Sequence, residues 1–493
     1  MFSYFPNNSI ALLIFSAIAV YTLYWLVKQE KTQYLIYALL VWFPLESLIL
    51  LYTPTRYYSY VKYFPEILIY GLFVGAWIYY FKKNHRLIPR QPVNKWLVIF
   101  LGVAFVSLII NHYNLFVWSL GVRQILRFVL IFFVMLFMRY PSDIWRKFLL
   151  IGGAMIGLEA VLGLIQYALG GRIDQYLFSA QTVTVGGSSL LAEAEMFWAP
   201  GSRVFATLGR YDRLGSLLAL GLIVLFPWKY YLKNNQQKIW YWSAMVVGAI
   251  CLLFTLSRAS WLAAFFGILV IGGIINQDKK VWWAVAVLFL GVSAYLTGFA
   301  LARNNLASIT EKPNQSLAER VFEAVSYRAW RESYDGNGRA YFIINTPRRI
   351  IADKPFFGVG PGRFGGGVAA ALLNTSIYDK YLMPFGIQNI YGQIDNNWFS
   401  IWGETGTLGL ISWAMIFLTL IYMGVWVWPR LHHIDQQILA QGLVGLTVGI
   451  IILGFFGPYF EFRALMFYFW IVAGIVAGEW MGVKYRGDFL HDD

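Results

Sequence analysis

The chain has 493 residues, of which 59% are hydrophobic and only 13% are charged. Soluble domains carry about one quarter charged residues, so this composition excludes an ordinary water-soluble globular protein. The formal net charge is +14, and the single cysteine, Cys251, has no partner in the chain with which to form a disulfide. Because Cys251 lies in an apolar stretch, we expect a buried and unreactive thiol.

Apolar stretches long enough to cross a membrane recur along the chain. The first lacks the basic start and the small-residue cleavage site of a signal peptide, so we expect it to remain in the mature protein. Thirteen such stretches are predicted, at residues 9–27, 33–53, 64–81, 96–111, 122–138, 148–169, 214–232, 239–256, 260–276, 281–301, 405–428, 438–456 and 464–483. The predicted fold class is therefore an all-α polytopic membrane protein with about 12–13 transmembrane helices.

The basic residues predict the orientation of these helices. With a cytoplasmic C-terminus and thirteen spans, the inner segments hold twelve lysines and six arginines, and the outer segments hold four lysines and seventeen arginines. The short inner loops carry the most positive charge for their length, which fits the preference of cytoplasmic loops for lysine and arginine. A guanidinium fits two phosphate or carboxylate oxygens at once, so the outer arginines favour an anionic, phosphorylated substrate. Salt bridges or lipid headgroups would also account for them.

Two long segments interrupt the alternation of apolar stretch and short loop. The predicted organisation is N-terminal transmembrane helices at 1–169, an outer loop with a basic stretch at 170–213, transmembrane helices at 214–301, an extracytoplasmic module at 302–404, transmembrane helices at 405–483, and a cytoplasmic tail at 484–493. The module has turn signals and amphipathic runs such as SLAERVFEAVSYRAWRESY, so we expect it to be mostly helical. Loops of this length are usually functional or disordered, and its aromatic residues and mixed charges favour function.

Four arginines stand in motifs on the predicted outer face. Arg258 follows Ser257 in the narrow gap between two spans, where an arginine is costly unless it faces a polar cavity or an anion. Snorkelling of its side chain to the membrane interface is the alternative. Arg203 and Arg210 close the first outer loop, and Arg339 follows a glycine in the module.

Glycines and carboxylates mark the rest of the module. The run KPFFGVGPG at 354–362 suits a tight turn, either beside a ligand or for purely structural reasons, and it lacks the spacing of a nucleotide-binding fingerprint. Asp395 and Asn396 precede Glu404 where the chain re-enters the membrane. A carboxylate at a partly dehydrated mouth is a candidate general base, because burial raises its pKa. As an alternative, Asp395 would be the N-cap of the following helix. Glu404 and Glu159 would, in the same way, pack in the protein interior or pair with another buried group.

Histidines give no support for a metal site. Of the five in the chain, only His112 falls on the predicted outer face, so we expect metal-free chemistry.

Together these motifs resemble the O-antigen ligase and polysaccharide polymerase superfamily. The resemblance rests on SRASW after an apolar stretch, on Gly-Arg with a downstream PFFGVGPG, and on Asp-Asn before Gly-Glu-x-Gly-x-Leu-Gly, in that order over residues 200–430. It implies a GT-C-like glycosyltransferase architecture in the bacterial cytoplasmic (inner) membrane, with an active site that faces the periplasm or the cell exterior and uses no cofactor.

The resemblance also implies a reaction and roles for residues. An oligosaccharide on an undecaprenyl diphosphate carrier would be transferred, with inversion, to the hydroxyl of a glycan acceptor. Other polysaccharide-assembly proteins would be partners, and nucleic acid would not. By this resemblance Asp395, Arg258 and Arg339 are the expected catalytic residues, and the expected substrate-binding residues are Arg203, Arg210, Arg258, Arg339, Asn396 and Glu404.

One departure from the family pattern leaves alternatives open. Ligases carry His-Asn where this chain has Asp395 and Asn396, so the base is a carboxylate or another residue, and we favour a polymerase over a ligase that acts on a lipid A-core acceptor. A transporter of inorganic carbon or of lipid-linked glycan is the alternative from another class. It would need ionisable groups across the bilayer, and Glu159 stands nearly alone at mid-membrane depth.

Overall fold

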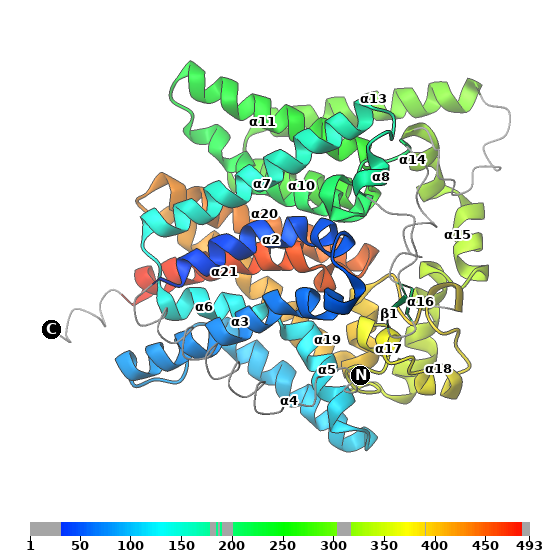
Figure 1. Cartoon of the computed structure of the whole chain (residues 1–493). Helices are drawn as coiled ribbons and strands as arrows, with labels where there is room; N and C mark the ends of the chain where they lie inside the picture. The colour runs from blue at the N-terminus through cyan, green and yellow to red at the C-terminus, as the bar shows by residue number, and fades with distance from the viewer. Residues whose placement is uncertain are drawn as a thin grey trace.

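The computed structural model describes residues 31–177, 184–185, 188–189, 201–302, 317–389 and 391–485. Long helices dominate this part of the chain and run side by side (Figure 1). Two strands of two residues, β1 (Thr184–Val185) and β2 (Ser188–Ser189), pair antiparallel. The first predicted span, at 9–27, and the tail from residue 486 lie outside the described residues.

The long helices are apolar, as the composition predicts. They are α2 (Gln33–Leu51), α3 (Thr55–Asn84), α4 (Val93–Asn111), α7 (Ser142–Ala168), α10 (Tyr211–Leu225), α11 (Asn235–Phe254), α12 (Arg258–Leu269), α13 (Lys279–Ala302), α19 (Asn397–Val427), α20 (Ile434–Phe456) and α21 (Arg463–Lys484). A 3-10 turn (Phe226–Tyr231) extends α10, and a π-helical turn (Val270–Ile275) extends α12. Eleven helical segments in the described part are long and apolar enough to cross a membrane.

A twelfth span is bent. Only together are helices α5 (Leu115–Leu126) and α6 (Val129–Met138) long and apolar enough to cross a membrane. The chain bends by 60° between them. Each predicted stretch from 33–53 onward therefore has a helix or this bent pair. The stretch predicted at 122–138 is this bent pair, and the chain turns at Arg127. The Arg127 guanidinium Nη2 donates to the Glu461 carbonyl oxygen at 2.6 Å, which gives this part of the side chain a partner inside the protein.

The helices differ in how deeply they are buried. In an apolar 18-residue stretch of α21, 89% of the residues are buried inside the protein. In the corresponding stretch of α13 none of the residues is buried. Glycines let α12 and α20 approach closely, because a Cβ atom at Gly267 would lie 2.8 Å from the carbonyl oxygen of Gly445. Cys251 is fully buried, as expected.

Helix α19 begins eight residues before the predicted span at 405–428. Gly406 interrupts it with a φ of 68°, and a Cβ atom there would lie 2.4 Å from the backbone of Phe356. The amide of Thr407, which the break leaves without its helical partner, donates to the Pro355 carbonyl oxygen at 2.8 Å. The apolar pattern thus located the part of the helix after the break and missed the first two turns.

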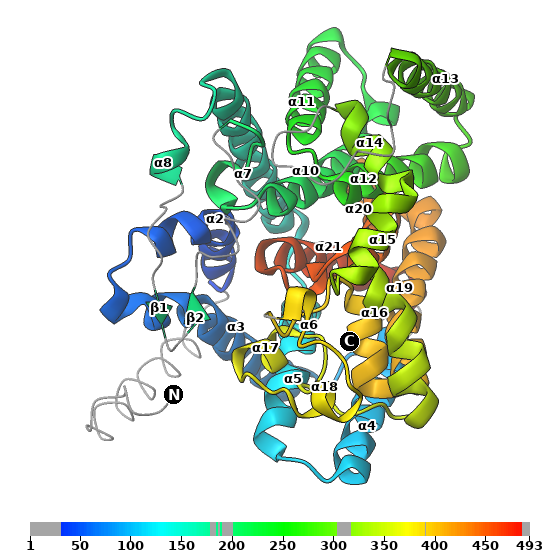
Figure 2. The ribbon, with the colours of Figure 1, turned by 90° about the vertical axis from the view of Figure 1, so that its right-hand side faces the viewer.

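The segment between α13 and α19 is helical, as predicted, and has its own small core around Phe342, Phe364 and Tyr378. Its elements gather at one end of the bundle, on the right-hand side of Figure 1 and toward the viewer in Figure 2. They are α14 (Leu317–Val325), α15 (Tyr327–Asp335), α16 (Arg339–Asn345), a π-helical turn (Thr346–Ile351), α17 (Gly367–Ala371) and α18 (Ser376–Lys380). The remaining short elements are α8 (Asp174–Leu177) and 3-10 turns at Ala206–Leu208, Ile387–Asn389, Trp428–Arg430 and Tyr459–Glu461.

Candidate functional site

The predicted site residues lie where α10, α12, α16, α19 and α21 begin. The 3-10 turn Tyr459–Glu461, which joins α20 to α21, lies at the centre of this meeting point. Its Phe460 amide donates to Asn397 Oδ1 at the start of α19 at 2.8 Å. Because helix N-termini carry partial positive charge, several of them at one place favour an anionic ligand.

Arg339 and Asp395, predicted separately, form an ion pair. Arg339 Nη2 donates to Asp395 Oδ2 at 2.9 Å, and its Nε donates to the Asp395 carbonyl oxygen at 3.1 Å. A further bond from Nη2 reaches the carbonyl oxygen of Phe456 at 2.7 Å. The two side chains remain 31% and 37% exposed. The arginine is thus held by α20 and by the residue that the sequence indicated as a base, with both groups open to solvent.

Arg258 is held by the module. Its Nη2 donates to Glu323 Oε1 at 3.0 Å, and Nη1 donates to the carbonyl oxygen of Arg320 at 3.3 Å. Arg320 binds the other oxygen of the same carboxylate at 2.9 Å. Glu323 therefore joins two arginines and ties α14 to the start of α12.

Arg203 and Arg210 lie together at the start of α10, in different environments. Arg210 Nε and Nη2 each donate to a different oxygen of Asp212 at 3.0 Å. Arg203 is only 3% exposed and lies over the ring of Tyr211, 4.3 Å from its centroid. Among the described residues its Nε and Nη1 atoms have no hydrogen-bond partner, and a buried N–H group without a partner is unfavourable.

Tyr459 connects these arginine groups, and sequence reasoning missed it. Its side chain interacts with Asp212, Asp395 and Tyr211 electrostatically and with Ser257 by a side-chain hydrogen bond. Burial raises the pKa of the Tyr459 hydroxyl, and the carboxylates of Asp212 and Asp395 raise it further. The available signal was the break PYFE between the apolar stretches 438–456 and 464–483, which reads as a simple turn.

Asn396 is the N-cap of α19, so Asp395 is not. The Asn396 side-chain oxygen accepts from the Phe399 amide at 3.1 Å. Its amide nitrogen Nδ2 is buried and has no hydrogen-bond partner within the described part of the chain. Asp395, one residue earlier, is left available for Arg339.

Glu404 is held by the glycine-rich run. Its Oε1 accepts from the amides of Gly362 at 2.7 Å and Phe364 at 3.2 Å. The backbone of Gly360 has a φ of 107°, and a Cβ atom there would overlap the ring of Tyr113. The close approach that these glycines permit is therefore to the protein itself, which fits the structural-turn alternative.

A small pocket separates Glu404 from Glu461. It is lined by Gly121, Gln124, Ile125, Gly362, Gly366, Asn397, Ser400, Ile401, Glu404, Phe460 and Glu461. The Glu461 carboxylate accepts from Gln393 Nε2 at 3.1 Å and from the Gly367 amide at 3.3 Å. Burial raises the pKa of Glu461 to about 6, although the charge of Arg127 opposes this effect. Glu461 thus titrates close to neutral pH at the edge of the site.

Glu159 contacts the chain segment between Arg203 and Arg210. Its carboxylate accepts from the amide of Thr207 at 3.1 Å and from the Thr207 hydroxyl. These bonds agree with the buried-pairing alternative. Within the described residues, no three histidine, cysteine, aspartate or glutamate side chains group as metal ligands do.

The arrangement suits an anionic ligand that enters from the module side. Arg258 and Arg339 are each paired with one carboxylate, and guanidinium groups also bind phosphate oxygens, often through two nitrogens at once. The fold and the site together define a multi-pass, helical membrane protein with an arginine-rich polar site at one end of its bundle.

Within this class, residues 243–414 match the family model described as O-antigen ligase. The match confirms the resemblance to the O-antigen ligase and polymerase superfamily and includes Arg258, Arg339 and Asp395. The family indicates glycosyl transfer in polysaccharide biosynthesis, with lipid-linked glycan and acceptor substrates in a membrane. No curated protein matches the chain. Arg203, Arg210 and Tyr459 lie outside the matched range.

Proposed function

We propose that the protein is a polysaccharide polymerase that moves oligosaccharide units from an undecaprenyl-diphosphate-linked donor to the hydroxyl of an acceptor sugar, with inversion and without a metal. One observation carries the proposal. Tyr459 interacts with Asp212 and Asp395, the ion-pair partners of Arg210 and Arg339, and with Ser257 next to Arg258, and Arg258 and Arg339 lie in the range that matches the O-antigen ligase model.

The arginines act on the donor side of this reaction. The acceptor oxygen attacks the anomeric carbon, and the bond between that carbon and the diphosphate oxygen breaks with its electron pair on the diphosphate. Negative charge on the leaving group grows in the transition state, where guanidinium groups held by the protein stabilise it most. Arg258 and Arg339 contact the diphosphate, and Arg203 and Arg210 extend the same basic surface.

The proton of the acceptor hydroxyl passes to Asp395. In the structure this carboxylate is paired with Arg339. A diphosphate that takes over the Arg339 guanidinium weakens this pair and leaves Asp395 a better base. Donor binding would thus prepare the acceptor side. Asn396 contacts substrate through its unpaired Nδ2, and Glu404 does so through the oxygen that does not hold the glycine run.

The proposed location is the bacterial cytoplasmic membrane, with the site on its outer face. The excess of lysine on the predicted inner segments supports this orientation. Inner segments also join by ion pairs at the opposite end of the bundle, such as Lys229 with Asp278 at 2.7 Å. The module then lies outside, where lipid-linked glycans are assembled.

A ligase that acts on a lipid A-core acceptor would use the same donor chemistry and differ only in the acceptor. Supplying both acceptors separates the two. Transport would need a path of ionisable groups, and Glu159 is occupied by Thr207. The polymerase therefore remains the better supported function.

The test is transfer by purified protein from a synthetic undecaprenyl-diphosphate-linked repeat, with Arg258→Ala, Arg339→Ala and Asp395→Asn beside wild type. Arg328→Ala is the matched control, because Arg328 is an exposed arginine of the same module, paired with Glu332 four residues on. We expect chain growth in wild type and in the control and its loss in the three site variants. Absence of transfer by wild type to any supplied repeat or lipid A-core acceptor would overturn the proposal.

A further inference from the structure

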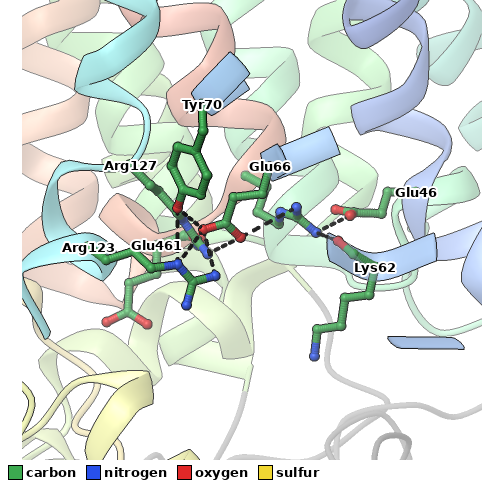
Figure 3. A network of polar contacts seen from close by, with 8 residues as sticks. Glu46, Lys62, Glu66, Tyr70, Arg123, Arg127 and Glu461 are labelled. Carbon is green, nitrogen blue, oxygen red and sulfur yellow. Dashed lines mark hydrogen bonds and ion pairs between the residues drawn. The ribbon is translucent and has the colours of Figure 1, made fainter. Parts of the chain in front are cut away.

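A second group of basic side chains lies near Glu461, the last residue of the Tyr459–Glu461 turn (Figure 3). This second basic cluster consists of Lys62, Arg123, Arg127 and Arg463, together with the carboxylates Glu46 and Glu66. Its members come from α2, α3, the bend between α5 and α6, and the first residue of α21. No motif in the sequence pointed to it, since its residues are far apart along the chain.

Glu66 is the centre of the cluster and is shared by three arginines. Arg123 Nη2 lies 2.6 Å from one carboxylate oxygen, and Arg127 and Arg463 each lie 4.0 Å from the other. The hydroxyl of Tyr70 donates to the first oxygen. Glu66 is only 3% exposed, so one buried carboxylate balances three guanidinium groups.

Arg463 is held by two further groups and still has free donors. Its Nη1 pairs with Glu46 and donates to the Lys62 carbonyl oxygen at 2.8 Å. Its Nε and Nη2, and the Nε of Arg127, are buried without a hydrogen-bond partner among the described residues. These N–H groups are therefore available to donate hydrogen bonds to a bound ligand.

Positive charge exceeds negative charge in the cluster. Four basic side chains accompany two carboxylates, and Arg213 at the start of α10 acts electrostatically on both Lys62 and Glu46. Glu461 acts on Arg127, but its carboxylate bonds to Gln393 and Gly367. An unbalanced charge away from water is costly, so the cluster favours an anion from outside.

Lys62 lies at the edge of the cluster, where the anion would enter. Its Nζ lies 5.8 Å from the centroid of the Tyr58 ring and points away from Glu46 and Glu66 in Figure 3. Its charge interacts with those of Arg463 and Arg127. Lys62 therefore presents an ammonium group at the edge of a cluster whose guanidinium groups have unused donors.

The cluster continues the candidate functional site. Arg213 follows Arg210 by three residues, and Arg463 follows Tyr459 by four, so the same two chain segments border both. A substrate bound to Arg210 and Arg339 would have its adjoining sugars near Lys62 and Arg463.

We propose that the second basic cluster is a binding site for a carboxylate or phosphate group carried by the glycan, and that the natural substrate is therefore an acidic glycan. The inference rests on the proposed function for the identity of the ligand. Guanidinium and ammonium groups at a sugar subsite distinguish an acidic sugar from its neutral counterpart, because only the acidic sugar balances their charge.

The test compares two synthetic undecaprenyl-diphosphate-linked repeats that differ only in one sugar, glucuronic acid or glucose. The variant is Lys62→Met, which keeps the Lys62 carbonyl oxygen that Arg463 uses, and the control is Lys83→Met at the far end of α3. We expect Lys62→Met to raise KM for the acidic repeat about tenfold, which equals about 1.4 kcal/mol, with kcat and the neutral repeat unchanged. Equal KM values for both repeats in wild type, or no effect of Lys62→Met, would overturn the inference.

Thermal stabilisation in detergent gives a readout that does not depend on transfer. Sodium glucuronate should raise the unfolding temperature of wild type and of Lys83→Met, and should do so less for Lys62→Met. Stabilisation only by anionic phosphatidylglycerol would instead make the cluster a lipid-headgroup site and refute the glycan assignment. If glucuronate stabilises the protein while neither repeat is transferred, the proposed polymerase fails and the anion site stands.

Discussion

The two arginine groups of this protein share one helix junction and differ in how their charges are balanced. In the candidate site Arg210 and Arg339 each pair with a carboxylate of their own, Arg258 shares Glu323 with Arg320, and the Arg339–Asp395 pair is about one third exposed on both sides. In the second basic cluster Glu66 serves three arginines, and its side chain is 4% exposed. An exposed pair exchanges partners at little cost, whereas a buried shared carboxylate does not. The first arrangement suits a reaction, and the second holds helices together while it offers surplus donors.

The largest expected effect is on transfer and arises in the candidate site. Arg339→Ala should lower kcat/KM for chain growth by about 100-fold or more, the usual loss when one donor to a developing charge is removed. Arg339→Lys should restore only part of it, because an ammonium lacks the planar fork. Initial rates with the lipid-linked repeat measure both. A rate for Arg339→Ala equal to that of wild type would contradict the assignment of the reaction to the candidate site.

The next effect is on stability and arises in the second basic cluster. Glu66→Ala leaves three partly buried guanidinium groups, with side chains 33%, 16% and 14% exposed, without their shared carboxylate, which should cost about 3 kcal/mol. Asp395→Asn removes one partner of an exposed pair and should cost about 1 kcal/mol or less. Thermal unfolding of both variants in one detergent provides the comparison. Equal losses of stability would contradict it.

A smaller effect depends on pH. The folded-state pKa of Glu461 is raised to about 6 from the ordinary 4.5, so its protonated form favours folding at low pH, and this contribution is lost as pH rises through 6. Glu461→Gln should therefore gain stability relative to wild type between pH 5 and pH 7.5, by roughly 1 kcal/mol. Unfolding temperatures at the two pH values measure this gain, and a constant difference between the proteins would show that burial does not perturb Glu461.

The smallest effect is expected where an arginine is neither shared nor at the site. Arg328 is 55% exposed in its pair with Glu332, so Arg328→Ala should change stability by less than about 1 kcal/mol. Its transfer rate should match that of wild type. A large loss of transfer in this variant would show that arginines of the module matter in general, whatever their partners.

The sequence predicted the apolar helices well, because length and hydropathy alone decide which segments can cross a membrane. It did not predict the bend at Arg127 or the break at Gly406, because both depend on contacts with distant segments: the carbonyl groups of Glu461 and Pro355. A continuous apolar pattern gives no sign of such contacts.

The candidate site was predicted in part. Motif order located Arg258, Arg339 and Asp395, but the ion pair between the last two joins residues 56 positions apart and needs the fold. Tyr459 and Glu461 lie in a six-residue break between helices that has the composition of an ordinary turn. The sequence assigned the glycine run either to a ligand or to a turn, and the contacts with Tyr113 and Glu404 show that it packs against the protein.

The most direct test of the central claim is the product of the purified wild-type protein when it is given the lipid-linked repeat and a metal chelator. The account predicts glycans that grow by whole repeats, with one undecaprenyl diphosphate released for each new bond and with inverted configuration at the new linkage. Unchanged glycan lengths with every acceptor, together with passage of the lipid-linked repeat or of bicarbonate across liposomes that contain the protein, would contradict it and identify a transporter.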